Sequence, residues 1–114
     1  MALKVLLSSG DFSMKATLND TAAAQVAASK LPVEGLAQTR GAEVYFFVDF
    51  SIEAQDPTEE APPGTIAYWP AGSAVSIVYG SRPITPVEVI GQLDGDPTEW
   101  RKVISGSTIS MRKA

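Results

Sequence analysis

The sequence predicts a mainly β protein, a closed or nearly closed barrel of eight strands with two short helices. Eight short segments have strand-like apolar patterns and are separated by Gly- and Pro-containing turns. Only two segments carry helix signals, so the crossover helices of an α/β fold are missing. Of the 114 residues, 45% are hydrophobic and 19% charged, enough to fill one core. A two-sheet sandwich is the alternative, and residues 1–114 are expected to form one domain.

The N-terminal segments predict a β-hairpin followed by a helix. Residues 3–8 and 12–18 are strand-like, and in 12–18 apolar and polar residues alternate with the period of a strand that has one buried face. Asn19-Asp20-Thr21 offers capping side chains ahead of the alanine-rich residues 22–30, which favour a helix. Leu31-Pro32 ends this predicted helix.

The rest of the chain predicts six more strands and a second helix. Asp96-Pro97-Thr98-Glu99 has an N-cap Asp followed by Pro at the first helical position, so a short helix begins there and carries Trp100. Residues 55–64 hold three prolines and three acids, which predicts an exposed loop. Gly91 stands alone in a strand and suggests a bulge or bend. The six strands are predicted at 36–39, 43–52, 65–69, 74–79, 87–93 and 107–112.

Composition excludes several classes of function. With no Cys and no His, the chain has no disulfide, thiol nucleophile, Cys/His zinc site or Ser-His-Asp triad. Nine basic and thirteen acidic residues give a net charge of −4, the wrong sign for electrostatic nucleic-acid binding. No apolar run is long enough for a membrane span or a signal peptide, so we expect a cytoplasmic protein. No phosphate or calcium loop is recognisable, and no metal or cofactor is expected.

The strand predicted at 43–52 has two different faces. One face is wholly apolar and should point into the barrel, because an eight-stranded barrel is filled by its own side chains. The other face carries two rings and two carboxylates, which a helix or loop covers or which line a groove open to a ligand. The inward face is Val44, Phe46, Val48 and Phe50, and the outward face is Glu43, Tyr45, Phe47 and Asp49.

Other aromatic and basic residues could extend this groove. Successive strand residues face opposite ways, so only one of Tyr68 and Trp69 is interior; Trp69 is either a structural plug of the Pro-Ala-Gly turn or a wall of the groove. Two arginines at turns are either solvated or hold a carboxylate or carbonyl group with their forked donors. The candidate ligand-binding groove is therefore Arg40, Glu43, Tyr45, Phe47, Trp69, Tyr79 and Arg82. No catalytic residue is assigned.

Several motifs occur in an order that resembles the cyclophilin-like family of small bacterial and archaeal proteins. The most specific are Gly41-Ala42-Glu43-Val44-Tyr45-Phe46 and Tyr68-Trp69-Pro70-Ala71-Gly72, and the resemblance covers nearly the whole chain. It implies a cyclophilin-type barrel capped by helices; in true cyclophilins the proline-binding groove lies outside the barrel. The chain lacks the Arg-x-x-x-x-Phe, Gln-Gly-Gly-Asp and Gln-Phe-Phe-Ile segments of true cyclophilins. In the family an aromatic residue often stands at the position of Arg40.

Three functions stay open from the sequence. The first is a binding module whose outer groove takes a small molecule or a proline-containing, extended peptide. The second is a peptidyl-prolyl isomerase with non-standard residues, in which Arg40 or Arg82 is the donor and Phe47 or Trp69 the apolar slot. The third is a structural role as a homodimer or larger homo-oligomer that buries the aromatic face.

Overall fold

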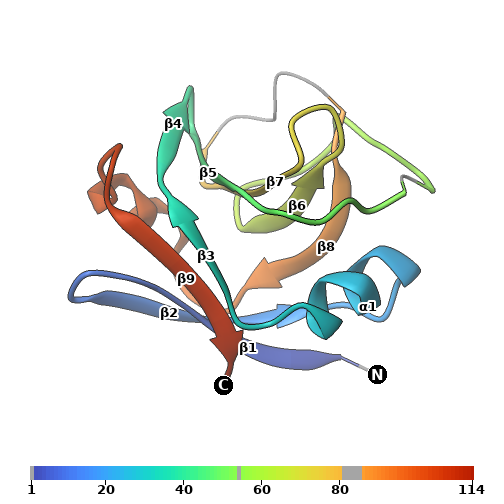
Figure 1. The fold of residues 1–114 in the computed structure, drawn as a ribbon. Helices are drawn as coiled ribbons and strands as arrows, with labels where there is room; N and C mark the ends of the chain where they lie inside the picture. Colours follow the sequence, from blue (N-terminus) through green and yellow to red (C-terminus); the bar gives the residue numbers. More distant parts are fainter. Residues whose placement is uncertain (1, 54, 81–85) are drawn as a thin grey trace.

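The computed structural model describes residues 2–53, 55–80 and 86–114, and in this part of the chain it contains nine strands, one α-helix and one 3-10 helix. The strands form one antiparallel sheet in the order β3-β9-β1-β2-β8-β6-β7-β5-β4. The sheet curls into a nearly closed barrel (Figure 1). The elements are β1 Leu3–Ser9, β2 Phe12–Leu18, α1 Ala22–Ser29, β3 Val33–Leu36, β4 Gln38–Arg40, β5 Glu43–Phe47, β6 Thr65–Trp69, β7 Ala74–Val78, β8 Glu88–Leu93, η1 Pro97–Lys102 and β9 Thr108–Lys113.

The ninth strand comes from the segment that closes the barrel. The sequence predicts one strand over 36–39, whereas the structure has β3 and β4 on either side of Ala37. β3 pairs with β9, and β4 pairs with β5. β3 and β4 are therefore the two edge strands of the sheet. One short stretch of chain therefore spans the place where the sheet meets itself. The predicted barrel is confirmed, and the predicted number of strands is one too low.

Local sequence signals place the first hairpin and the start of both helices correctly. In β2 the apolar residues Met14, Ala16 and Leu18 are buried, as their alternation predicts. Thr21 caps α1, since its side chain accepts a hydrogen bond from the N–H of Ala24 at 3.2 Å. α1 lies against β8 and buries three alanines. Asp96 caps the second helix, which is a 3-10 helix and buries Trp100.

The strand predicted at 43–52 is shorter than expected. β5 ends at Phe47, and just after it the N–H of Val48 donates a hydrogen bond of 2.9 Å to the carbonyl of Ser73, the residue before β7. The inward apolar face is nevertheless used, because Val44 and Phe46 are fully buried. Phe50 reaches the core from irregular chain and stacks on Tyr68, with ring centres 6.4 Å apart. The alternating pattern therefore continues beyond the strand that it predicts.

The proline-rich loop is only partly exposed, which corrects the expectation from its composition. Thr58 forms an isolated bridge with Val87, and Ala61 is fully buried. Ala61 packs with Ala67, Val78 and Val87 in a second apolar cluster, separate from the main core. The buried Glu88 carboxylate helps to hold the loop, since its Oε1 accepts hydrogen bonds from the N–H groups of residues 55 and 56 at 3.1 and 3.0 Å.

The prediction of a bulge at Gly91 is confirmed. The register between β6 and β8 shifts after Ile66, which pairs with Gly91, because the next residue Ala67 pairs with Val89. A Cβ at Gly91 would lie 2.4 Å from the carbonyl oxygen of Thr17 on the other neighbour of β8. Glycine is required there by the close approach of β2.

No helix of the described residues is long and apolar enough to cross a membrane.

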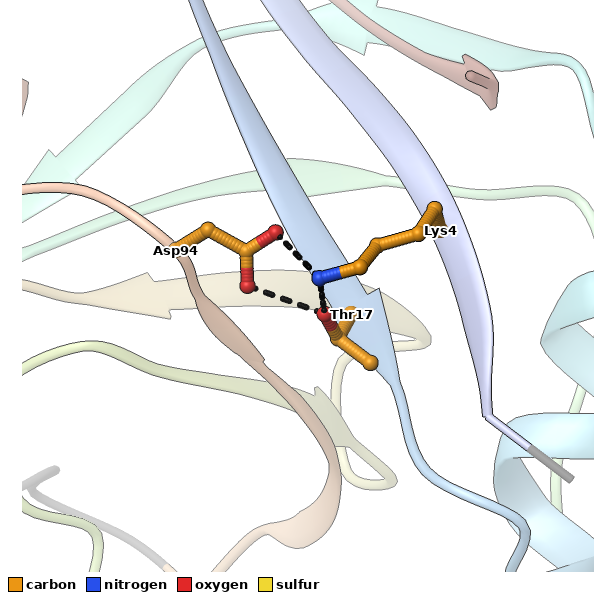
Figure 2. Close-up of polar contacts among 3 residues, drawn as sticks. All are labelled: Lys4, Thr17 and Asp94. Atoms are coloured by element: carbon orange, nitrogen blue, oxygen red, sulfur yellow. Dashed lines mark hydrogen bonds and ion pairs between the residues drawn. The ribbon is translucent and has the colours of Figure 1, made fainter.

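An exposed polar contact joins β1, β2 and the residue that follows β8 (Figure 2). Lys4 Nζ on β1 donates to Thr17 Oγ1 at 2.8 Å and to Asp94 Oδ2 at 2.9 Å. Thr17 Oγ1 on β2 donates to the other carboxylate oxygen of Asp94 at 2.9 Å, just after β8. The hydrogen bond from Lys4 is the main cause that lowers the pKa of Asp94, followed among the lowering causes by the hydrogen bond from Thr17; burial opposes them.

We expect this contact to make the free energy of unfolding depend on pH in the acid range. Because the pKa of Asp94 is lower in the folded chain than its ordinary 3.8, its stabilisation is complete above about pH 4 and is lost as the pH falls through the lowered value. Lys4→Met should move the pKa of Asp94 up toward 3.8 and cost about 0.2–1 kcal/mol at pH 7. NMR titration of the Asp94 carboxyl carbon would measure its pKa, and urea unfolding between pH 2 and about 7 would measure the free energy of unfolding. Lys113→Met is the matched control and should leave the Asp94 titration unchanged.

Candidate functional site

The predicted outward face of β5 lies on the outside of the barrel, beside β4 and β7. The register places Glu43 opposite Arg40 and Tyr45 opposite Gln38 on β4. On the other side of β5, Tyr45 is opposite Ser76. Side chains from three strands thus meet on one external surface, whose inner side is the packed core of Val44 and Phe46.

Four side chains on this surface form what we call the Arg40 cluster: Arg40, Tyr45, Phe47 and Trp69. The guanidinium carbon of Arg40 lies 4.6 Å from the ring centre of Trp69 and 5.6 Å from that of Tyr45. Tyr45 meets both Phe47 and Trp69 edge to face, each with ring centres 5.7 Å apart. These distances fit cation–π and aromatic contacts, so the cluster holds Arg40 between rings.

Glu43 lies beneath the cluster and is buried. Its side chain is only 4% exposed, against 26% for Arg40. Ser76 Oγ donates a hydrogen bond of 2.6 Å to Glu43 Oε1. Arg40 Nη2 is 3.9 Å from the same oxygen, an ion pair too long for a hydrogen bond. The carboxylate therefore balances the charge of Arg40 without satisfying its donors.

Three donor nitrogens of the cluster are buried without an acceptor among the described residues. Arg40 Nε and Nη2 and Trp69 Nε1 have no hydrogen-bond partner among the described residues. An unpaired buried donor costs about 1–3 kcal/mol, more when the group is charged. These atoms have almost no exposed surface, so a molecule that brings an acceptor oxygen reaches them only when the cluster opens, and it would then recover part of that free energy.

The structure decides which of Tyr68 and Trp69 faces outward. Tyr68 is 1% exposed, and its hydroxyl donates to the carbonyl of Phe50 at 3.3 Å, so it belongs to the core. Trp69 is half-buried on the outside and packs against the second apolar cluster. Its ring also covers the turn that follows, because a Cβ at Gly72 would lie 2.3 Å from the ring. Trp69 is thus both a plug of its own turn and part of the Arg40 cluster.

An open pocket begins at Phe47, the exposed end of the cluster. The Phe47 side chain is 52% exposed, an unusual state for a large apolar ring. The pocket has a volume of about 500 Å³ and lies between β3 and the chain that follows β5. Its lining consists of Lys30, Pro32, Val33, Glu34, Phe47, Val48 and Asp49.

Comparison with known proteins decides the family. A family model described as cyclophilin-like matches residues 1–112. The chain belongs to the cyclophilin-like family. No curated protein matches its sequence.

Solved structures support the same fold for this cyclophilin-like protein. The solution structure of the hypothetical protein AF2241 from Archaeoglobus fulgidus has a TM-score of 0.81 and 20% sequence identity, over 98% of this chain and 95% of that chain. McbB, solved in complex with tryptophan, has a TM-score of 0.78 and 14% identity, over 96% of this chain and 44% of McbB. At these identities the likeness concerns the fold.

The structure brings together five of the seven residues that the sequence proposes for the groove of this cyclophilin-like protein. These are the four residues of the Arg40 cluster and Glu43. Tyr79 lies at the end of β7, where its hydroxyl is 3.5 Å from the carbonyl of Gly41, and it packs against the main core. Arg82 lies outside the described residues. Asp49 is exposed and lines the pocket beside Phe47.

Sequence reasoning missed two features of this surface. Ser76, the hydrogen-bond donor to Glu43, lies in an apolar strand, and its polar side chain among Val75, Ile77 and Val78 was the available signal. Lys30 and Glu34 were missed because they follow a helix end and lie in a strand with no aromatic residue. They reach the pocket only because β3 lies near the end of β5.

Proposed function

We propose that this cyclophilin-like protein is a binding module that holds a small molecule or an extended peptide on its outer face at the Arg40 cluster. The ligand pairs an apolar ring with an acceptor group, either a carboxylate or a carbonyl. The observation that carries the proposal is the set of three buried donor nitrogens without an acceptor among the described residues. The cytoplasmic location is the sequence's prediction and is part of this proposal.

The chemistry of the cluster supports this ligand class. Arg40 is permanently charged and offers a planar fork of donors that fits a carboxylate. Tyr45 lies in contact with both Arg40 and Phe47. The exposed ring of Phe47 supplies an apolar surface for a ring of the ligand. McbB, of which 44% of the chain matches this fold, was solved in complex with tryptophan, an aromatic amino acid, and this gives a reason to test that class first.

Titration with N-acetyl-phenylalanine tests the proposal, with its amide as the neutral probe. Isothermal calorimetry should detect binding of the carboxylate and at least tenfold weaker binding of the amide, since a charged hydrogen bond is replaced by a neutral one. Arg40→Lys keeps the charge above Glu43 but loses the fork, and should weaken carboxylate binding about tenfold or more.

Lys102→Arg is the matched control, because Lys102 is exposed and pairs with Glu99 away from the cluster. It should leave binding unchanged. If neither probe binds the native protein at millimolar concentration, or if Arg40→Lys binds as well as the native protein, the Arg40 cluster is not the site.

Peptidyl-prolyl isomerisation is the second candidate function. Arg40 and the exposed Phe47 both contact Tyr45, and this favours it, because a donor to the twisting amide and an apolar slot for the proline ring would lower a barrier of about 18–20 kcal/mol. A protease-coupled assay on an Xaa-Pro peptide should then show acceleration that Arg40→Lys and Phe47→Ala both reduce. No acceleration at micromolar protein would reject the isomerase.

A further inference from the structure

The barrel is open along one part of the place where its sheet meets itself. β4 pairs with β5 only from Glu43 to Tyr45, so the last residues of β5 have no neighbour there among the strand pairings. Near Gly35 of β3 the two edges touch, since a Cβ at Gly35 would lie 2.9 Å from the carbonyl oxygen of Phe47. Beyond that contact the chain after β5 turns away from β3 (Figure 1), and the 500 Å³ pocket lies between them. We call this opening the seam pocket.

Backbone groups of β3 point toward the seam pocket. Ala37 exchanges hydrogen bonds with the β9 side, donating to Ser107 at 2.7 Å and accepting from Gly106 at 2.9 Å. Peptide groups alternate in direction along an antiparallel strand, and the β3–β9 register continues from this pair. The N–H and C=O groups of Val33 and Gly35 therefore point toward β9. The N–H and C=O groups of Glu34 point away from β9, into the seam pocket.

The same reasoning applies to the end of β5. Val48 donates to Ser73 at 2.9 Å, and Tyr79 donates to Ala42 at 2.9 Å, so the even-numbered residues of β5 bond toward β7. The peptide groups of Phe47 point the opposite way, toward β3. The peptide groups of Glu34 and Phe47 that point to the seam pocket thus have no backbone partner among the described residues, and such strand edges are the usual template for an added strand.

The seam pocket has an apolar floor and a rim that carries negative charge. Val33 and Val48 are half-buried and pack against the main core, so they form an apolar floor. Glu34, Asp49 and the ring of Phe47 are exposed at the rim, which carries two negative charges. Lys30 is the one cation of the described lining and lies at the end of α1.

We propose that the seam pocket binds an extended peptide by strand addition to β3, and that the peptide alternates basic and apolar residues. In a strand, alternate side chains point to opposite faces. The apolar residues of the peptide would pack on Val33 and Val48, and the basic ones would meet Glu34 and Asp49 at the rim. The pocket volume lies within the range of about 300–1,000 Å³ that is usual for ligand sites. The seam pocket shares Phe47 with the Arg40 cluster, but its strand edges and its acidic residues Glu34 and Asp49 are not part of that cluster, so the proposal goes beyond the acceptor-binding function.

Fluorescence anisotropy with a labelled, acetylated and amidated Lys-Val-Lys-Val-Lys peptide tests the proposal. The peptide should bind the native protein, and the double variant Glu34→Lys/Asp49→Lys should bind it at least tenfold more weakly. The same double variant should bind Glu-Val-Glu-Val-Glu at least tenfold more tightly than the native protein does. The matched control Asp11→Lys/Glu59→Lys makes an equal change of charge at exposed acids elsewhere and should change binding less than threefold.

Backbone pairing is tested separately from charge. N-methylation of alternate peptide bonds removes the donors that strand addition needs and should weaken binding at least tenfold. The amide of Glu34 should exchange with deuterium more slowly when the peptide is bound. Equal binding of the N-methylated peptide, or no binding of the native peptide, would overturn the proposal.

Two further outcomes identify other occupants. A dimer seen by light scattering that Glu34→Lys/Asp49→Lys dissociates would mean that a second copy fills the seam pocket, against the proposal. Arg40→Lys should leave binding of the labelled peptide unchanged while it weakens binding of N-acetyl-phenylalanine. If this one substitution removed binding of both the peptide and N-acetyl-phenylalanine, the peptide would bind at the Arg40 cluster, and this would also overturn the proposal.

Discussion

Trp100→Ala should lower the free energy of unfolding by about 3–5 kcal/mol, the range for removing a fully buried tryptophan. The Trp100 side chain has no exposed surface and packs in the main core. Phe12 meets it edge to face with ring centres 5.0 Å apart. A 3-10 helix of six residues carries this ring, and its own hydrogen bonds are too few to hold it in place without the packing. Urea unfolding followed by circular dichroism would measure the loss.

Trp100→Phe separates packing from hydrogen bonding at the same position. The indole Nε1 of Trp100 is buried with no partner among the described residues, so phenylalanine removes an unpaired donor as well as some volume. We expect it to cost less than half of the Trp100→Ala loss. A Trp100→Ala cost below about 1 kcal/mol would contradict the burial on which this prediction rests.

The second large effect concerns the charges beneath the Arg40 cluster. Arg40→Met should cost about 3 kcal/mol, because it leaves the Glu43 carboxylate buried with Ser76 as its hydrogen-bond donor and no cation beside it. Glu43→Leu should cost a similar amount by leaving Arg40 unbalanced. The double variant should cost clearly less than the sum, since neither charge is then left alone. Urea unfolding of the four proteins gives the coupling free energy directly.

The exposed ion pair of Lys4 with Asp94 is the internal control for this cycle. Its lysine side chain is 63% exposed, so its contribution should stay below about 1 kcal/mol. Equal coupling free energies for the two pairs would mean that Glu43 is hydrated in solution. The Arg40 cluster would then not be held by a buried charge.

Features that depend on near neighbours in the chain were predictable from the sequence. The caps at Thr21 and Asp96 are decided within one helical turn, and the bulge at Gly91 by a single missing side chain. The inward direction of Val44 and Phe46 followed from strand alternation and the limited space inside a small barrel. The outward direction of Tyr45 and Phe47 followed from the same argument.

Features that depend on the order of strands in the sheet were not predictable. Glu43 is buried because β5 lies between β4 and β7, which brings Arg40 and Ser76 to it from opposite sides. Trp69 reaches Tyr45 across an intervening strand, since β6 is separated from β5 by β7. The seam pocket exists because β5 ends at Phe47, while the apolar alternation that predicted a longer strand continues to Ile52.

The pairing of the first and last strands has a mechanical consequence. β1 and β9 are antiparallel neighbours, and Val5 near the start of β1 is opposite Lys113 near the end of β9. A force that pulls residues 3 and 113 apart therefore acts at one end of the ladder and breaks its hydrogen bonds one after another rather than all together. Tethered by these two positions, the barrel should open at low force. Tethered between Leu3 and Leu18, whose strands likewise meet at a single end, it should peel in the same sequential manner.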